Sequence, residues 1–255
     1  MKCKICGNES GLLCNKEILD KYSVRYYRCK KCKFIQTEKP YWLKEAYTSA
    51  IIDTDTGILM RNTALSKVAA IVTLFFLDKK IKILDYAGGY GIMTRMLRDI
   101  GLDCYWSDKY AENIFAKLFP SQKKEKYDLV TAFEVFEHLE NPVVEIKKII
   151  KTYKPKIILF STMLHNGNPD KNWWYFVPQG GQHISLFTKK SLKELAKKTG
   201  MKLSTNGKNL HILSSKRIPS LFLIIISITH PVLSWFLPLF YKSKTFSDHQ
   251  PIFKK

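Results

Sequence analysis

The chain has 255 residues and a formal charge of +20, with 42 Lys and Arg residues against 22 Asp and Glu residues. This length suffices for one large domain with a hydrophobic core and a small appendage. A hydrophobic content of 45% excludes a globally disordered chain.

The positive charge suits a nucleic acid or an anionic membrane surface. However, 36 of the basic residues are Lys and only 6 are Arg. Arg is the residue that recognises phosphates and bases bidentately. We therefore attribute the positive charge to lysines spread over solvated helix faces, and we disfavour nucleic acid as the partner.

The N-terminus predicts a cytoplasmic location. The sequence Met1-Lys-Cys-Lys-Ile-Cys6 does not match the start of a secretory signal peptide. Without such a signal, closely spaced cysteines are expected to bind metal rather than to form disulfides. Cys14 and Cys104 have no such neighbour and are expected to be small buried residues.

Residues 1–39 contain two Cys-x-x-Cys pairs, Cys3 with Cys6 and Cys29 with Cys32, separated by 22 residues. This spacing predicts a zinc ribbon, because each tight turn presents two thiolates to one ion. Four thiolates complete a tetrahedral shell, which makes the predicted Zn²⁺ structural rather than catalytic. Disulfides or free thiols are the alternative.

Residues 41–78 are predicted to be helical, with a break at 53–57 that is rich in helix-capping residues. From Ile58 to Phe76 the apolar residues form a long apolar face.

A glycine-rich turn follows. A β-branched run ends at Asp85, a helical pattern starts at Ile92, and between them lie Gly88, Gly89 and Gly91. Strand, glycine turn and helix in this order are typical of a nucleotide-type site at the carboxyl end of a parallel strand. Glycine lets the backbone approach a ligand, and the helix start offers free N–H groups. An ordinary strand-to-helix turn is the alternative.

A second strand over 101–108 ends in Asp108, 23 residues after Asp85. Here α/β folds place a carboxylate that binds ribose hydroxyls. The sequence therefore resembles class I S-adenosylmethionine (SAM)-dependent methyltransferases, whose motif is hydrophobic-Asp-x-Gly-x-Gly-x-Gly with an acid ending the second strand. Ala87 replaces the first family glycine. The resemblance implies that SAM is held by Asp85, Ala87, Gly88, Gly89, Gly91 and Asp108.

Further residues gain roles through the resemblance. Helices before the first strand cover the SAM site in this family, so Arg61 becomes a candidate for the carboxylate of SAM, with an exposed helix arginine as the alternative. The run from Lys126 to His138 resembles the Asp-hydrophobic-…-Glu-Val-x-Glu-His run of small-molecule methyltransferases. It implies that Phe133 and Glu134 border the methionine end of SAM.

By the same resemblance, Glu137 and His138 face the acceptor. Histidine suits general-base catalysis because its unperturbed pKa lies near neutrality. The alternative is that His138 only caps a turn. His183 is the second base candidate, in a Gly-Gln-His-Ile-Ser-Leu-Phe run that resembles the zinc-ribbon branch of the family, which largely modifies sugars and cell-envelope glycans.

His183 closes a long loop, 165–183, which leaves the carboxyl edge of the sheet and should lie over the active site. Its aromatic residues could stack on a sugar or an aromatic acceptor, or anchor the loop to the core. They are Trp173, Trp174, Tyr175 and Phe176.

The expected fold is α/β, a Rossmann-like class I methyltransferase sheet that ends in an antiparallel hairpin. Strands are predicted at 81–85, 102–107, 127–133, 156–162, 201–206 and 209–215, and helices near 91–100, 111–118, 142–153 and 188–199. The third family strand has only one candidate, 115–119.

The segment from Ile218 to Tyr241 has no Asp, Glu, Lys or Arg, and Lys216, Arg217, Lys242 and Lys244 flank it. Its length permits a membrane span, but Pro231 and Pro238 divide it. A membrane-surface segment, a span, or a packed core or dimer interface are the alternatives.

The sequence thus predicts a SAM-dependent methyltransferase that acts on a sugar, a nucleotide sugar or an envelope-glycan intermediate. Its expected location is cytoplasmic or at the inner face of the membrane. The expected segments are a zinc ribbon at 1–39, a helical cover at 40–78, the SAM-binding core at 79–216 and an apolar extension at 217–255. An RNA methyltransferase and a non-enzymatic SAM- or glycan-binding module are the alternatives.

Overall fold

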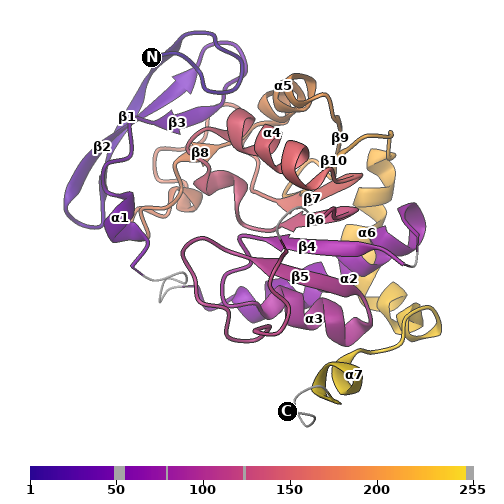
Figure 1. Cartoon of the computed structure of the whole chain (residues 1–255). Helices are drawn as coiled ribbons and strands as arrows, with labels where there is room; N and C mark the ends of the chain where they lie inside the picture. The colour runs from indigo at the N-terminus through magenta and orange to yellow at the C-terminus, as the bar shows by residue number, and fades with distance from the viewer. Residues whose placement is uncertain (49–54, 79, 123–124, 251–255) are drawn as a thin grey trace. The chain divides into compact units, whose positions relative to one another are not determined.

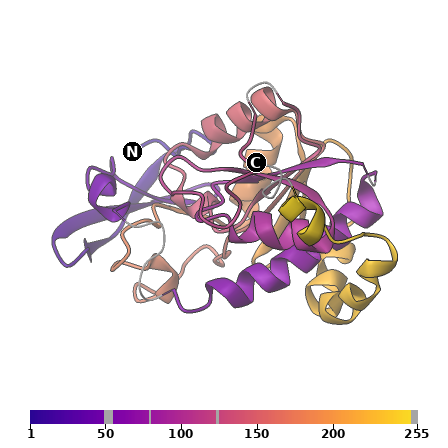
Figure 2. The same ribbon diagram turned by 60° about the horizontal axis from the view of Figure 1, so that its bottom comes forward.

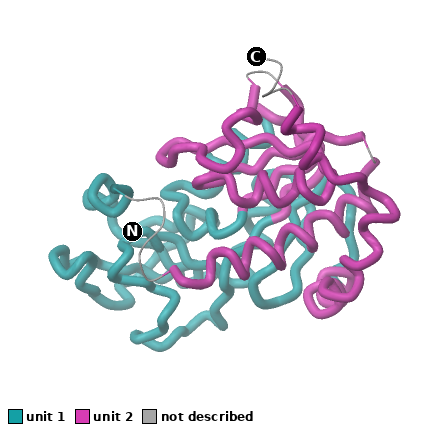
Figure 3. The backbone as a smooth tube through the Cα atoms, turned by 90° about the horizontal axis from the view of Figure 1, so that it is seen from below, with its two compact units in different colours: residues 1–49, 133–151, 160–220 teal, residues 50–132, 152–159, 221–255 magenta. Residues whose placement is uncertain are grey.

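The computed structural model describes residues 1–48, 55–78, 80–122 and 125–250 of the chain. The described residues form two sheets, a four-stranded one of order β1-β2-β3-β8 and a six-stranded one of order β5-β4-β6-β7-β10-β9 (Figure 1). The chain divides into two compact units (Figure 3). Unit 1 comprises residues 1–49, 133–151 and 160–220, and unit 2 comprises residues 50–132, 152–159 and 221–255.

The six-stranded sheet has the mixed α/β, Rossmann-like arrangement expected from the sequence. β4 (Lys82–Tyr86) pairs in parallel with β5 (Asp103–Ser107) and with β6 (Leu129–Ala132). β7 (Ile157–Ser161) is buried along its whole length, as parallel strands covered on both faces are. The predicted terminal hairpin is confirmed, because β9 (Lys202–Thr205) and β10 (Leu210–Ser214) pair antiparallel.

The helices around this sheet also agree with the predicted positions. They are α3 (Ile92–Ile100), α4 (Pro142–Tyr153) and α5 (Lys189–Thr199). α5 begins at a capping box, in which Thr188 and Ser191 each satisfy a backbone N–H of the other. Short 3₁₀ helices lie at η1 (Phe136–His138) and η2 (Trp174–Phe176).

One predicted helix is wrong. The segment 111–118 forms turns and bends, because several of its backbone N–H groups donate to acceptors that a helix would not use. Those of Ile114 and Phe115 donate to the Tyr90 carbonyl, and that of Ala116 donates to the Asn113 side chain. The predicted third strand at 115–119 is also absent as a strand. A single parallel bridge joins Trp106 to Pro120 instead.

Unit 1 carries the small sheet. β1 (Ser10–Ile18) and β2 (Tyr22–Cys29) form an antiparallel hairpin, and β3 (Ile35–Thr37) pairs with β2. β8 (Ser185–Leu186), far away in the sequence, pairs with β3 and completes the sheet. Beneath it lies a buried cluster of Ile18, Val24, Tyr26, Ile35, Trp42, Tyr175, Phe176 and Leu186. The short α1 (Leu43–Ala46) follows β3.

Unit 2 contains the long α2 (Ile58–Phe76), which runs beside α3 (Figure 2). The predicted break at 53–57 falls partly on residues 53 and 54, which lie outside the described residues. The C-terminal part of unit 2 consists of α6 (Ser220–Leu233), the 3₁₀ helix η3 (Ser234–Leu239) and α7 (Thr245–His249).

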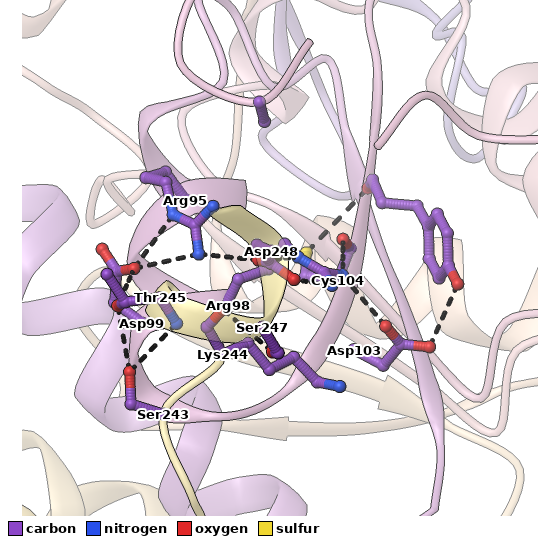
Figure 4. A network of polar contacts seen from close by, with 12 residues as sticks. Arg95, Arg98, Asp99, Asp103, Cys104, Ser243, Lys244, Thr245, Ser247 and Asp248 are labelled. Atoms are coloured by element: carbon purple, nitrogen blue, oxygen red, sulfur yellow. Dashed lines mark hydrogen bonds and ion pairs between the residues drawn. The ribbon is translucent and has the colours of Figure 1, made fainter. Parts of the chain in front are cut away.

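A buried ion-pair network ties α7 to α3 and β5 (Figure 4). Arg98 is 4% exposed, and its Nε and Nη2 donate to the two Asp248 oxygens, both at 2.7 Å. Its Nη1 donates to Asp103 at 2.9 Å, and Arg95 donates to Asp248 at 2.9 Å. Because a buried guanidinium is costly without partners, this network holds the C-terminal helix in place.

Candidate functional site

The glycine turn lies in unit 2, between β4 and α3. Ala87, Gly89 and Gly91 all adopt positive φ angles, of 55°, 53° and 88°. A Cβ on Gly88 would lie 2.4 Å from Asp85 Oδ2, so this position accepts only glycine without displacement. Ala87 therefore adopts the left-handed conformation that makes glycine usual in the family motif, at some cost in strain.

Asp85 is turned into the protein. It is 3% exposed, and its two oxygens accept hydrogen bonds from Thr94 Oγ1 at 2.9 Å and Thr131 Oγ1 at 3.2 Å. Burial raises its pKa to about 6, although the two hydroxyls oppose this shift. The carboxyl thus connects β4 to α3 and β6 and fixes the base of the turn.

Two residues at the end of β5, Trp106 and Asp108, form hydrogen bonds to the glycine turn. The Gly89 N–H donates to Asp108 Oδ2 at 2.9 Å, and Trp106 Nε1 donates to the Gly89 carbonyl at 2.8 Å. Asp108 Oδ1 also accepts the N–H groups of Tyr110 and Ala111, at 2.7 Å and 2.9 Å. Asp108 is therefore engaged with backbone donors at the position where the family resemblance places the ribose.

Arg61 lies in the first turn of α2, and its guanidinium donates to Asp55 at 2.6 Å. It is the remaining cofactor candidate in unit 2. Phe133 and Glu134 belong to unit 1, and both are half-buried.

Glu134 follows β6 with a positive φ of 54°. Its N–H donates to Ser161 Oγ at 2.8 Å, and the Ser161 hydroxyl donates back to Glu134 Oε1 at 2.5 Å. These two hydrogen bonds stabilise a positive φ, which residues other than glycine rarely adopt. Such backbone conformations concentrate at functional sites.

Unit 1 brings all three catalytic candidates together. One ligand atom from each of Glu137, His138 and His183 lies within 4.8 Å of the other two. The imidazole centroids of the two histidines are 5.2 Å apart, and the Tyr47 ring is 6.2 Å from that of His138. Two imidazoles and a carboxylate can act in proton transfer, and they are also common ligands of divalent metals.

Glu137 has no exposed surface. Its Oε1 accepts a hydrogen bond from the Tyr175 hydroxyl, and its Oε2 has no hydrogen-bond partner within the described part of the chain. Burial, and then the charge of Glu134, raises the pKa of Glu137 to about 8. A buried carboxyl oxygen without a hydrogen-bond partner destabilises the folded protein and is therefore unusual. Such an oxygen indicates a functional group.

Both histidines are neutral at physiological pH. Burial lowers the pKa of His183 to about 4. Burial, and then the electrostatic interaction with the neighbouring His183, lowers the pKa of His138 well below its usual value. His183 Nδ1 lies 2.7 Å from the Tyr175 carbonyl oxygen, which can only accept a hydrogen bond. Nδ1 of the neutral ring therefore carries the hydrogen, and Nε2 carries the free lone pair.

Tyr175 organises the triad, a role that no sequence feature indicated beyond its place in the aromatic loop. Its carbonyl orients His183 and its hydroxyl orients Glu137. The Tyr175 ring is 3% exposed and belongs to the core cluster of unit 1, as does Phe176. In contrast, Trp174 is 66% exposed. The loop aromatics therefore divide into anchors and one residue available for stacking.

The four predicted zinc ligands also converge in unit 1. The Sγ atoms of Cys3 and Cys32 are 3.6 Å apart, those of Cys6 and Cys29 are 3.4 Å apart, and all four lie within 4.8 Å of one another. Tetrahedral Zn–S bonds of about 2.3 Å place neighbouring sulfurs about 3.8 Å apart, whereas a disulfide needs about 2.0 Å. The donor set therefore fits a zinc ion and not a pair of disulfides.

The two cysteine turns have the same local structure. Gly7 and Lys33, each directly after the second cysteine of its pair, have φ angles of 80° and 62°. Their N–H groups donate to the carbonyls of Cys3 and Cys29, at 2.9 Å and 3.2 Å. Both turns thus curl back to present two thiol groups to one point.

Comparison with known proteins identifies the larger part of this chain. A family model described as "Methyltransferase domain" matches residues 60–206. No curated protein matches the chain.

Several solved methyltransferase structures are similar to parts of this chain. Mitomycin 7-O-methyltransferase MmcR is 16% identical with a TM-score of 0.46, over 61% of this chain and 54% of that one. The plantazolicin methyltransferase BpumL, solved with SAH, is 15% identical with a TM-score of 0.48, over 68% and 89% of the two chains. Magnesium protoporphyrin IX methyltransferase from Synechocystis PCC 6803, also with SAH, is 15% identical with a TM-score of 0.45, over 67% and 90%.

The chain therefore spans about half the length of MmcR and most of the length of the other two. Since the family match covers more than half of its residues, this chain belongs to the methyltransferase domain family and contains a class I, SAM-dependent methyltransferase domain.

Proposed function

We propose that this enzyme methylates a hydroxyl group of a small molecule, specifically a sugar, a nucleotide sugar or an envelope-glycan intermediate. The observation that carries the proposal is the triad of Glu137, His138 and His183, in which Tyr175 fixes both the carboxyl and one imidazole. An exposed indole, that of Trp174, lies in the same loop and suits the apolar face of a sugar ring. The sequence run around His183 supports the same class of acceptor.

The cofactor, when bound, supplies an electrophilic methyl group on a sulfonium sulfur. Because the transfer is an in-line displacement, the main task of the protein is to hold the acceptor oxygen in position and to remove its proton. His183 Nε2 has the lone pair for that proton, since Nδ1–H is committed to the Tyr175 carbonyl. His138, the neighbouring imidazole, is the second acceptor of the pair.

In its ionised form, Glu137 can compensate the charge that this step creates. The imidazole becomes a cation when it takes the hydroxyl proton, in a place where burial disfavours cations. A carboxyl oxygen of Glu137 lies within the same group of converging atoms, and Glu137 Oε2 has no hydrogen-bond partner among the described residues. The ionised form of this carboxyl, which predominates above its pKa of about 8, can accept a hydrogen bond from the imidazolium.

Methyl transfer from radiolabelled SAM to a panel of nucleotide sugars tests this function. We expect His183→Ala to lower kcat by about 10²–10⁴-fold, the usual contribution of a general base, and to leave SAM affinity unchanged. His138→Ala should also slow turnover strongly and retain SAM binding. His230→Gln, a change in α6 of unit 2, is the control and should retain full activity.

Two results would contradict the proposal. Unchanged turnover in the His183 and His138 variants would remove the base role from both. Methyl transfer to RNA and to none of the small acceptors would favour the RNA methyltransferase.

We also infer that the four cysteines hold a structural Zn²⁺. No position of the closed Cys₄ shell would remain open for a substrate, so the ion would stabilise the β1–β3 segment rather than take part in chemistry. The geometry of free thiols, too far apart for disulfides, supports a reducing, cytoplasmic location for the enzyme.

A further inference from the structure

The C-terminal elements α6 and η3 present an apolar face to solvent. Ile228 is 73% exposed, Trp235 75% and Leu239 77%. Other large apolar side chains exposed along the same stretch recur at helical spacing, namely Leu221, Ile224, Ile225, Val232, Phe236 and Phe240. A contiguous exposed apolar surface of this kind marks a place of interaction.

The opposite face of these elements is packed against their own unit. Leu223 and Ile226 are buried, and the Phe222 ring contacts the rings of Phe75 and Phe76 in α2, with centroids 5.4 Å and 4.7 Å apart. The stretch Ser220–Leu239 is long and apolar enough to cross a bilayer, as is α2. However, lipid cannot surround a helix that has one face packed on protein. This geometry suits a helix that lies flat in the membrane interface.

Three hydroxyl groups on α6 and η3 are satisfied within their own helical segment. The hydroxyls of Ser227, Thr229 and Ser234 each donate to a backbone carbonyl three or four residues earlier, at 2.8–2.9 Å. His230 Nδ1 lies 3.2 Å from the Ile226 carbonyl oxygen in the same way. Hydroxyl groups satisfied within their own helix can enter an apolar medium without leaving an unpaired donor.

The charges that flank the apolar face of α6 and η3 indicate the kind of surface that this face binds. The sequence from Ile218 to Tyr241 contains no charged side chain, while Lys216 and Arg217 precede it and Lys242 and Lys244 follow it. Basic residues at both ends of an apolar helix suit the anionic headgroups of lipids. A second copy of this chain docked on the same face would instead bring like charges together.

We propose that α6 and η3 bind the surface of an anionic bilayer, with Ile228, Trp235 and Leu239 inserted below the headgroups. This inference goes beyond the proposed function, since membrane binding does not depend on the identity of the methyl acceptor. It accounts for an exposed apolar face in a chain that is otherwise rich in surface lysine.

Co-sedimentation of the full chain with vesicles of phosphatidylglycerol and phosphatidylcholine tests the proposal. We expect binding to these vesicles and much weaker binding to phosphatidylcholine alone. Ile228→Asp should lower the partition coefficient by at least roughly tenfold, since a charge then occupies the inserted face. Val144→Asp is the matched control, because Val144 is 62% exposed on α4, outside unit 2, and should bind as the parent does.

A depth measurement separates insertion from adsorption of a basic protein. Lipids brominated in their acyl chains should quench tryptophan fluorescence at high salt, where simple charge attraction is screened. Trp235→Phe should remove most of that quenching, while Trp174→Phe should not. Absence of vesicle binding, or quenching that survives Trp235→Phe, would overturn the proposal. A dimer in vesicle-free solution that Ile228→Asp dissociates, without vesicle binding by the parent, would assign the face to a second copy.

Discussion

The Asp108 carboxylate accepts the backbone N–H of Gly89 at 2.9 Å, so the end of β5 fixes the glycine turn that follows β4. The other oxygen of the same carboxylate holds the N–H groups of Tyr110 and Ala111. A single acidic side chain therefore joins two loops of unit 2, the one before α3 and the one after β5. Its removal should disturb cofactor binding even where no contact with the ribose is lost.

Asp108→Asn tests this relationship. The amide oxygen can still accept from Tyr110 and Ala111, but the amide NH₂ would then face the Gly89 N–H, and two donors repel each other. We expect SAM affinity, measured by isothermal titration calorimetry, to fall at least roughly tenfold, which corresponds to about one lost charge-assisted hydrogen bond. Asp20→Asn, at an exposed position of unit 1, should leave the affinity unchanged. Full SAM affinity in Asp108→Asn would show that the turn keeps its shape without this bond.

Gly88→Ala should destabilise the protein. The added Cβ would lie 2.4 Å from Asp85 Oδ2, and the carboxyl cannot move freely because Thr94 and Thr131 hold it. We expect a loss of about 1–3 kcal/mol in the free energy of unfolding, together with weaker SAM binding. Gly11→Ala is a matched control, since a Cβ there meets no atom within 4 Å. Urea denaturation of the two variants compares them directly, and equal stability would contradict the close approach.

Zinc analysis of the purified protein tests the cysteine site. We expect one zinc per chain by mass spectrometry, and Cys29→Ser should release it and lower the melting temperature. Cys14→Ser, which changes a cysteine outside the cluster, should retain both the metal and the stability. A metal-free protein with freely titratable thiols would contradict the zinc ribbon. A second equivalent of metal would point to Glu137, His138 and His183 as a further ligand set.

His211 predicts a pH dependence of stability. It is fully buried between Thr205 and Thr162, and burial lowers its pKa from 6.5 to about 4. The unfolded chain therefore binds more protons between these pH values, so stability falls as the pH drops from 6.5 toward 4. We expect the stability difference between the parent and His211→Gln to shrink by about 3 kcal/mol across this window. A difference that stays constant from pH 7 to 4 would contradict the buried neutral state.

Much of the fold could be predicted because local signals coincide with the final structure. The strand before Asp85, the helix after Gly91 and the hairpin around Asn206-Gly207 each have a buried run bounded by turn residues. Such elements need little information from the rest of the chain. The methyltransferase family and its α/β sheet followed from these elements and the order of the motifs.

Other features depend on contacts between residues far apart in sequence. The segment 111–118 looks helical by composition, yet Tyr90 and Asn113 capture its N–H groups. Tyr175 gave no distinct signal, because its role depends on a carbonyl and a hydroxyl that meet His183 and Glu137 only after folding. The hydrogen-bond partners of Asp108 could not be predicted either. Sequence spacing locates an acid at a strand end, but it does not identify the N–H groups that donate to the carboxylate.

The pairing of β3 with β8 has a consequence for how the protein is made. Gln36 lies opposite Ser185 in this sheet, so one strand leaves the ribosome long before its partner is synthesised. The β1–β3 hairpins and the four cysteines can assemble early, but the free edge of β3 must wait for β8. His183 lies two residues before β8, so its placement beside Glu137 must follow the synthesis of the first 183 residues. The nascent chain would thus complete its catalytic triad only when the methyltransferase core has almost entirely emerged.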